Sequence, residues 1–254
     1  VVEQDALDGT LSGYKVLYLT DQHVSAAAAR KIADWVRRGG TLFATAGAGM
    51  YDELNQPNSV LRELLGVEPT ALDAPGPQIL YEKQDLPFVS PIDTVTWKRA
   101  EDSLAMPVVG IRSRVTLKGA AAEATFRDAS PAVATRAVGS GRTIYCGFLP
   151  GLTYYRPAIP QRPVDRGSTD DAMCHFLPTE FDAGAAALIG LPAQDLPRPV
   201  ECSQPLVETT IIEARQGTVI RKRCVAQPTK LQGVLLQRLK LILPRHLHIH
   251  ECSE

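Results

Sequence analysis

Apolar and polar positions change their period twice within residues 15–46, and the changes separate a strand, a helix and a second strand. Residues 15–20 alternate and are rich in β-forming side chains, as in a buried strand. Ser25 precedes an alanine-rich run and is placed to cap a helix. Residues 41–46 are nearly all apolar or small, so the stretch predicts a right-handed β-α-β unit with parallel strands. The apolar positions of the helix share one face: Ala28, Ile32, Trp35 and Val36.

The rest of the chain carries shorter patterns. A hairpin is predicted where the turn at residues 139–141 joins two of the strands, and Gly66 and Gly190 are placed to end two helices. Proline-rich residues 69–91 and 150–178 are expected to form irregular excursions. Residues 1–6 are interpreted as the end of a strand. The predicted strands are residues 95–97, 108–117, 124–127, 132–138, 142–148 and 207–214, and the predicted helices are residues 60–65 and 182–188.

Composition excludes several classes of function. The chain has 254 residues and a formal net charge of −1, which gives no electrostatic case for binding nucleic acid or an anionic membrane surface. No apolar run approaches the roughly 20 residues that a membrane-spanning helix needs. The five cysteines are widely spaced and form no CxxC pair, so neither a disulfide framework nor a zinc finger is predicted. No cofactor is predicted, and no feature of the sequence assigns a compartment.

Two blocks of the chain share motifs with a known family. The first comprises residues 14–19, residues 32–46 with a Gly39–Gly40 pair, and residues 49–53. The second comprises residues 130–133, 138–142 and 145–151, the last of which reads YCGFLPG. These motifs resemble the trimerisation domain of family 42 β-galactosidases, unevenly over residues 1–213. They are motifs of a fold rather than of an active site.

The resemblance implies an α/β, flavodoxin-like fold of the class I glutamine-amidotransferase-like type, a three-layer sandwich. We expect this domain over residues 1–190, with an irregular or β-rich insertion at about residues 68–130. In the family a strand and a helix precede the first residues found here, so the resemblance implies a truncated N-terminus. Residues 191–254 are expected to form a linker, a small C-terminal β segment and a poorly defined tail, because the text after Gly217 departs from the family's pattern.

The same resemblance implies that no catalytic group remains. Glutamine amidotransferases of this fold need a cysteine at a strand-to-helix elbow, and a histidine and a glutamate after a later strand. The elbow here, residues 45–49, has glycines but no Cys or Ser at its centre, and Leu149 and Gly151 stand where His and Glu are required. The domain is then a pseudoenzyme. The glycines also match no phosphate-binding motif, so a tight turn is the favoured interpretation.

Polar side chains follow the first two predicted strands. Asp21, Gln22 and His23 come after one, and Asp52 and Glu53 after the other. In open α/β sheets ligands bind at this edge, so these residues are candidates for a sugar-contacting or interface-forming rim, with His23 as base and Asp21 as its orienter. The favoured alternative is a solvated loop edge with helix caps. Asp52 and Glu53 are sequence neighbours and are poorly placed to act as the paired carboxylates of a glycosidase.

Two further clusters are weaker candidates. Residues 154–175 begin with Tyr154, Tyr155 and Arg156, which are able to border a carbohydrate site or to dock a neighbouring domain or subunit, and docking is favoured. The alternating His246, His248 and His250 would share one face of a strand and could hold a zinc ion. Adventitious metal binding, or no role, is the favoured interpretation of these histidines.

The interpretation that follows is a non-catalytic oligomerisation or structural module of a β-galactosidase-like glycoside hydrolase. Its expected partners are the hydrolase's own barrel domain, which carries the family's catalytic glutamates, or neighbouring subunits, and carbohydrate is a further candidate partner. The alternative is a free-standing hydrolase or carbohydrate-binding protein that uses the rim around Asp21, His23 and Glu53.

Overall fold

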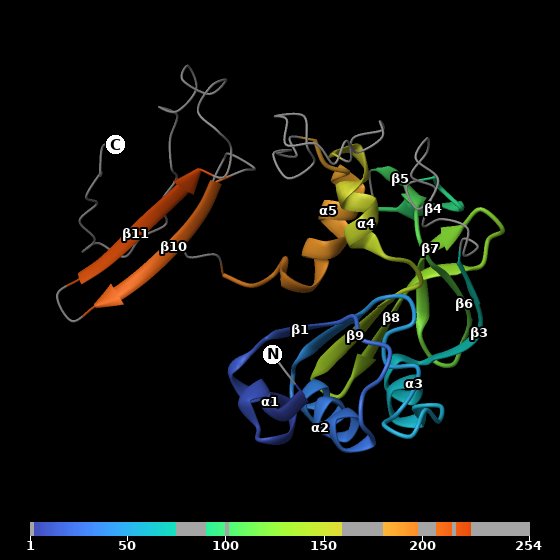
Figure 1. Ribbon diagram of the computed structural model, residues 1–254, viewed down its shortest axis with the longest axis horizontal. Coiled ribbons are helices and arrows are strands. Elements are labelled where there is room, and N and C mark those ends of the chain that lie inside the picture. The colour runs from blue at the N-terminus through green and yellow to red at the C-terminus, as the bar shows by residue number, and fades with distance from the viewer. Residues whose placement is uncertain are drawn as a thin grey trace, which may run out of the picture. The chain divides into compact units, whose positions relative to one another are not determined.

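The computed structural model describes residues 3–74, 90–99, 102–158, 180–197, 207–214 and 217–224. The chain divides into two compact units, Val1–Gln194 and Asp195–Glu254. The first unit is built on a sheet of seven strands with helices packed against it (Figure 1). The predicted α/β class is therefore confirmed, and the sheet is mixed.

The large sheet has a parallel and an antiparallel half. In the parallel half β2 (Thr41–Ala44) lies between β1 (Val16–Leu19) and β9 (Gly141–Cys146). The antiparallel half continues from β9 in the order β8 (Pro131–Val138), β7 (Ala121–Phe126), β4 (Asp93–Lys98) and β5 (Ser103–Val108). Outside this sheet, β3 (Val67–Asp73) and β6 (Arg112–Leu117) form a separate antiparallel pair.

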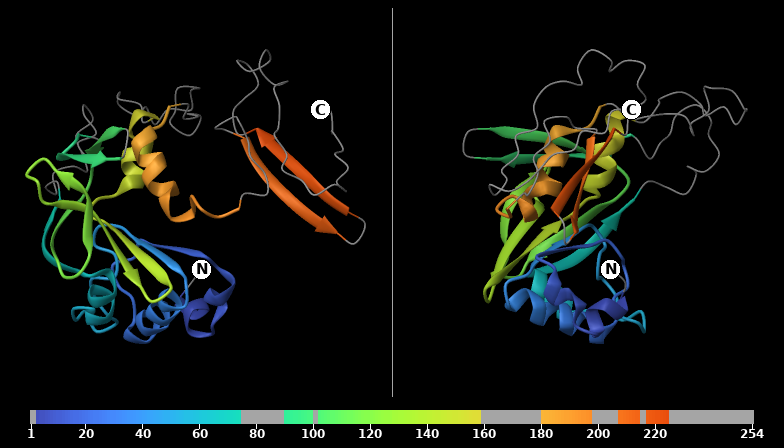
Figure 2. Two further views of the ribbon diagram at one scale, coloured as in Figure 1. Left: turned by 180° about the vertical axis from the view of Figure 1, so that it is seen from behind. Right: turned by 90° about the vertical axis from the view of Figure 1, so that its left-hand side faces the viewer.

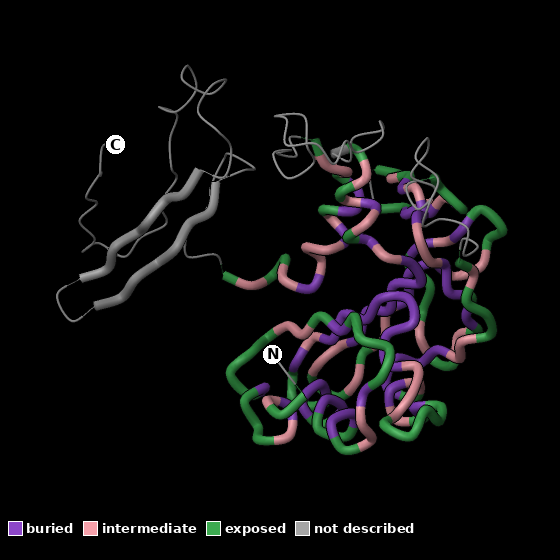
Figure 3. Tube along the Cα trace, viewed as in Figure 1, coloured by how far each residue is buried: buried purple, intermediate pink, exposed green. Residues whose placement is uncertain are grey.

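Helices lie on both sides of this sheet (Figures 1 and 2). On one side, α2 (Ala26–Arg37) and α3 (Ser59–Leu65) form an apolar core with Leu42 and Ala44 of β2. On the other side, Phe43 of the same strand belongs to a second core with α5 (Ala183–Gly190), against which α4 (Pro150–Tyr155) packs. Alternate residues of β2 thus enter different cores, and Figure 3 shows buried residues concentrated where sheet and helices meet.

The predicted β-α-β unit is confirmed. β1 and β2 are parallel and in register from Val16 opposite Thr41. Ser25 Oγ accepts a hydrogen bond from Ala28 N at 3.2 Å, as a helix cap does. The four predicted apolar positions of α2 are buried. The hairpin of β8 and β9 is confirmed as well.

Several local predictions are wrong. Residues 1–6 do not finish a strand, because α1 (Glu3–Leu7) occupies the described part and buries Ala6. The predicted strand over residues 108–117 is broken at Gly110, whose φ of +78° turns the chain between β5 and β6. Residues 69–73 are not irregular as predicted; they belong to the strand at residues 67–73, because β6 supplies backbone hydrogen-bond partners. Pro150 begins α4, where its fixed φ suits a first helical turn.

The described part of the first unit also contains the short 3₁₀ helices η1 (Thr10–Gly13), η4 (Arg156–Ala158) and η6 (Leu191–Ala193). The second unit contains an antiparallel hairpin of β10 (Val207–Ala214) and β11 (Gly217–Cys224). His246, His248 and His250 lie outside the described residues. Among the described helices, none has the length and apolar character needed to cross a membrane.

Candidate functional site

The carboxyl ends of the three parallel strands meet at one edge of the sheet. Thr45 N, just after β2, donates to Leu19 O at the end of β1 (3.1 Å). Ala46 N donates to Phe148 O, just after β9 (3.3 Å). The loops that follow β1, β2 and β9 therefore converge, at the edge where open α/β sheets usually bind ligands.

The glycine-rich elbow at this edge is a buried turn. Ala46 and Ala48 are 6% and 4% exposed, and Gly47 and Gly49 have φ of +80° and +63°. A Cβ atom at Gly49 would lie 2.5 Å from Leu61 Cδ1. The elbow has no Cys or Ser at its centre and is filled by packing, in agreement with its interpretation as a tight turn.

His23 and Asp21 are exposed on the loop after β1, but no hydrogen bond joins the two side chains in the described structure. His23 Nε2 lies 3.0 Å from Asn55 Oδ1, and its ring stacks on Tyr51 with centroids 5.5 Å apart. The backbone of His23 also bridges to Tyr51. The base-and-orienter pair of the alternative prediction is therefore not assembled; Asn55 is the residue that orients His23.

Two acidic side chains of the rim, those of Asp52 and Glu53, bind backbone amides. Glu53 Oε2 accepts from Ala26 N at 2.6 Å, at the start of α2. Asp52 Oδ1 accepts from Leu54 N (2.9 Å) and Gln56 N (2.8 Å), which closes residues 52–56 into a compact loop. A carboxylate at a helix N-terminus satisfies a free N–H and complements the helix dipole. Asp52 thus orders the loop, and Glu53 joins the loop to the start of α2.

Tyr154 and Tyr155 end α4 in an aromatic group with Phe181. The Tyr154 and Phe181 rings stack with centroids 4.5 Å apart, and Tyr155 meets Phe181 edge-on at 5.7 Å. Asp182 N donates to Tyr154 O (3.1 Å), and Asp182 Oδ1 caps α5 by accepting from Ala185 N. Tyr154 is half-buried, whereas Tyr155 is 49% exposed. Arg156 follows in η4, and residues 159–179 lie outside the described part of the chain.

Cys146 is fully buried at the end of β9. Burial raises the pKa of its thiol well above the usual value, since an apolar interior disfavours the thiolate. The thiol therefore packs as a small apolar group. Within the described residues, His, Cys, Asp and Glu side chains form no group of three or more able to hold a metal ion.

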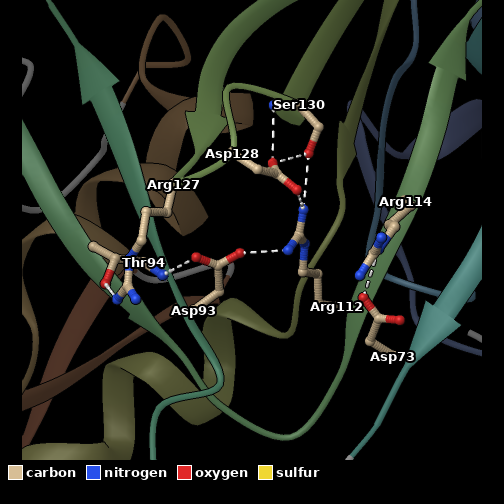
Figure 4. Close-up of polar contacts among 8 residues, drawn as sticks. All are labelled: Asp73, Asp93, Thr94, Arg112, Arg114, Arg127, Asp128 and Ser130. Carbon is tan, nitrogen blue, oxygen red and sulfur yellow. Dashed lines mark hydrogen bonds and ion pairs between the residues drawn. The ribbon is translucent and has the colours of Figure 1, made fainter.

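A polar cluster centred on Arg112 is absent from the sequence-based predictions (Figure 4). Arg112 Nη1 lies 2.7 Å from Asp93 Oδ2, and Nη2 bonds Asp128 and lies 2.9 Å from Ser130 Oγ. The guanidinium also stacks over Phe126, 4.4 Å from the ring centroid. The cluster therefore joins β4 and the β7–β8 turn of the antiparallel half to β6 of the separate pair.

The charges of this cluster differ in burial. Asp93 is 5% exposed, whereas the Asp128 side chain is half exposed. Hydrogen bonds from Ser130, and then from Arg112, hold the pKa of the Asp128 carboxyl far below its usual range. The Asp-x-Ser spacing of residues 128–130 was the available local signal, since Asp favours such turns. The partners Asp93 and Arg112 are distant in sequence, and no local pattern connects them.

Comparison with known proteins gives one family and a shared fold. The family model of the β-galactosidase trimerisation domain matches residues 1–160. The structure of the cold-adapted β-galactosidase from Rahnella sp. R3 has 20% identity and a TM-score of 0.51, covering 79% of this chain and 26% of that one. The β-galactosidase from Bacillus circulans sp. alkalophilus has 16% identity and a TM-score of 0.54, with the same coverage of 79% and 26%.

These two structures share the fold of this chain, which spans about a quarter of their length. A sequence search among curated proteins finds no match.

Proposed function

Because the chain belongs to the β-galactosidase trimerisation domain family, we propose that it is a non-catalytic module that holds together copies of a larger β-galactosidase-like glycoside hydrolase. The observation that carries this proposal is the family match over residues 1–160, well over half of the 254 residues. In this proposal residues 1–190 form the assembling module, and residues 191–254 form a linker and a small β segment.

The chemistry of the strand-end edge supports a non-catalytic role. The elbow after β2 has no Cys or Ser at its centre, the thiol of Cys146 is buried, and the rim carboxylates of Asp52 and Glu53 bind backbone amides. The alternative, a free-standing hydrolase based on His23, is not favoured because Asp21 does not orient the imidazole.

We further propose that the parallel half derives from a flavodoxin-like, class I glutamine-amidotransferase-like domain and is a pseudoenzyme. The support is its order of elements: a strand, the crossover helix α2, a strand with a glycine elbow, and a later parallel strand followed by a helix. On this assignment Leu149 and Gly151 occupy the positions of the lost histidine and glutamate.

The proposed partners are the hydrolase's barrel domain and neighbouring subunits. The surface at Tyr154, Tyr155 and Arg156 is our candidate for contact with one of them, since Tyr155 presents a large, half-exposed aromatic ring of the kind common in interfaces. The same ring could stack on a sugar in a site that this surface borders.

Sedimentation velocity on the complete chain, with a galactoside hydrolysis assay, tests the proposal. The expected result is a trimer without hydrolysis. A chain that stays monomeric at its highest soluble concentration contradicts the assembling role. Hydrolysis lost on His23→Ala, or glutaminase activity lost on Cys146→Ala, contradicts the non-catalytic role; Tyr51→Phe, which keeps the ring under His23, is the matched control for the first variant.

A further inference from the structure

The helix α2 carries opposite charges at its two ends. Glu3 Oε1 lies 3.2 Å from Ser25 N and Glu53 Oε2 lies 2.6 Å from Ala26 N, so two carboxylates mark the N-terminal end. With a rise of about 1.5 Å per residue, the two ends lie roughly 18 Å apart. Further along the helix the exposed charged residues are mainly cationic: Arg30, Lys31, Asp34, Arg37 and Arg38.

The acidic end is larger than these two carboxylates. Residues 3–14, 20–29 and 45–61 contain six Asp or Glu and no Lys or Arg. Backbone hydrogen bonds hold the second and third segments together, since Gly49 N donates to Asp21 O (2.8 Å) and Val24 N to Tyr51 O (3.0 Å). With a formal net charge of only −1, the chain has strongly separated charges rather than a strong overall charge.

We call residues 52–56 the 52–56 loop. This loop presents an apolar side chain at the acidic end. Leu54 is 74% exposed, the highest value among the exposed large apolar residues of the described chain. The loop is ordered by the Asp52 carboxylate, and Asn55, with φ of +58°, bonds to His23. A pre-ordered loop loses little conformational freedom when it binds a partner.

A groove beside the basic end has complementary properties. It lies between α2, α3 and the end of β8, and its volume is about 300 Å³. Leu64 and Val138 contribute apolar surface to it, and it is surrounded by three guanidinium groups, from Arg30, Arg37 and Arg136. Asp34 and Glu63 also line it, which leaves one excess positive charge. We call this the α2–α3 groove.

Trimer symmetry requires two unlike surfaces on each copy. A closed ring with an odd number of identical subunits uses heterologous contacts, in which one patch meets a different patch on the next copy. We propose that the 52–56 loop of one copy binds in the α2–α3 groove of the next, with Leu54 on the apolar surface and Glu53 near the arginines. This proposal rests on the proposed trimeric function and names the surfaces that perform it.

The chemistry of the two surfaces fits this pairing in three respects. The loop is acidic and the groove is rimmed by cations, which favours one orientation of the two copies and raises their association rate. Both surfaces have an apolar centre and a charged rim, as stable interfaces do. The two surfaces lie at different positions along α2, so one copy is able to use both at once.

Sedimentation of the complete chain over a concentration series tests the pairing. Leu54→Ser and Arg30→Glu are each expected to raise the concentration at which the trimer dissociates at least tenfold. The matched controls are Leu72→Ser, an exposed leucine on β3, and Lys98→Glu, an exposed cation on β4 that does not line the groove. Both controls are expected to assemble as the unaltered chain does.

A charge exchange gives a second measurement. Glu53→Lys alone is expected to weaken assembly, and the double variant Glu53→Lys with Arg30→Glu is expected to recover most of the loss, because loop and groove are then complementary again. Thermal melts recorded in parallel separate assembly from folding. If the altered charges act only on the α2 dipole, the variants will have a lower Tm but the same assembled mass as the unaltered chain.

The outcomes distinguish the two proposals. If the unaltered chain is a trimer and Leu54→Ser and Arg30→Glu assemble normally, the pairing is overturned and the trimeric function stands. The pairing is also overturned if the double variant assembles no better than the single variants. If the unaltered chain is monomeric, both proposals fail.

Discussion

The two halves of the sheet differ in where their polar side chains lie. In the loop that follows β2, Asp52 and Glu53 are near the surface and bind backbone amides of that loop and of a helix start. In the antiparallel half, Asp93 of β4 forms an ion pair in the interior with Arg112 of the neighbouring β6, with side chains only 5% and 10% exposed. The surface groups remain available to a partner, whereas the interior pair is inaccessible and stabilises the fold.

This difference in burial separates two uses of charge. A single contact of an exposed carboxylate contributes little to the free energy of unfolding, so exchanging that contact for another costs little. A buried charge whose partner is removed is left without solvation, which is costly. We therefore expect changes in the antiparallel half to affect folding and changes in the surface of the parallel half to affect assembly.

The largest effect is expected for Asp93→Ala, which leaves the Arg112 guanidinium buried with part of its partners gone. The free energy of unfolding should fall by about 3–5 kcal/mol, measured by urea denaturation. Asp73→Ala is the matched control, because Asp73 pairs with Arg114 at 2.7 Å but both side chains are well exposed. Its expected loss is below about 1 kcal/mol. Equal losses for the two variants would remove the distinction between the buried and the exposed ion pair.

An intermediate effect is expected for Gly49→Ala in the buried elbow. The new methyl group would meet Leu61 at 2.5 Å, and φ of +63° is strained for alanine. The free energy of unfolding should fall by about 1–3 kcal/mol. Gly151→Ala is the control, since a Cβ there has no atom within 4 Å and the residue lies in α4. A Gly49→Ala chain as stable as this control would mean that the packing against Leu61 does not restrict the elbow.

The smallest effect is expected for Asp128→Asn, and it should depend on pH. Folding lowers the pKa of Asp128, so its stabilising contribution is full above the unfolded-state value of about 4 and is lost as pH falls through the lower folded-state pKa. At neutral pH the variant should be less stable by at most about 1 kcal/mol, because the side chain is half exposed.

Denaturation of Asp128→Asn and the unaltered chain at neutral and acidic pH measures this. The free energies of unfolding of the two chains should approach each other below pH 4. A difference that stays constant with pH would show that the carboxylate charge contributes nothing.

Local patterns predicted the parts of the fold that local interactions stabilise. The α2 stripe, the Ser25 cap and the β8–β9 hairpin each depend on residues close in sequence. Tertiary contacts decided the rest: β3 became a strand because β6, more than 40 residues later, pairs with it. The short helix α1 is likewise held by α2, since Glu3 accepts from Ser25 N.

The candidate site divides in the same way. The sequence by itself determined which polar residues follow the parallel strands, and that no Cys or Ser lies in the elbow, because both depend only on residue identity and strand order. Only the tertiary structure decided what those residues do: Asn55 rather than Asp21 orients His23, Glu53 caps α2, and Arg112 joins Asp93 to Asp128. The physical reason is that hydrogen bonds and ion pairs depend on distances of about 3 Å between groups that the chain brings together only when it is folded.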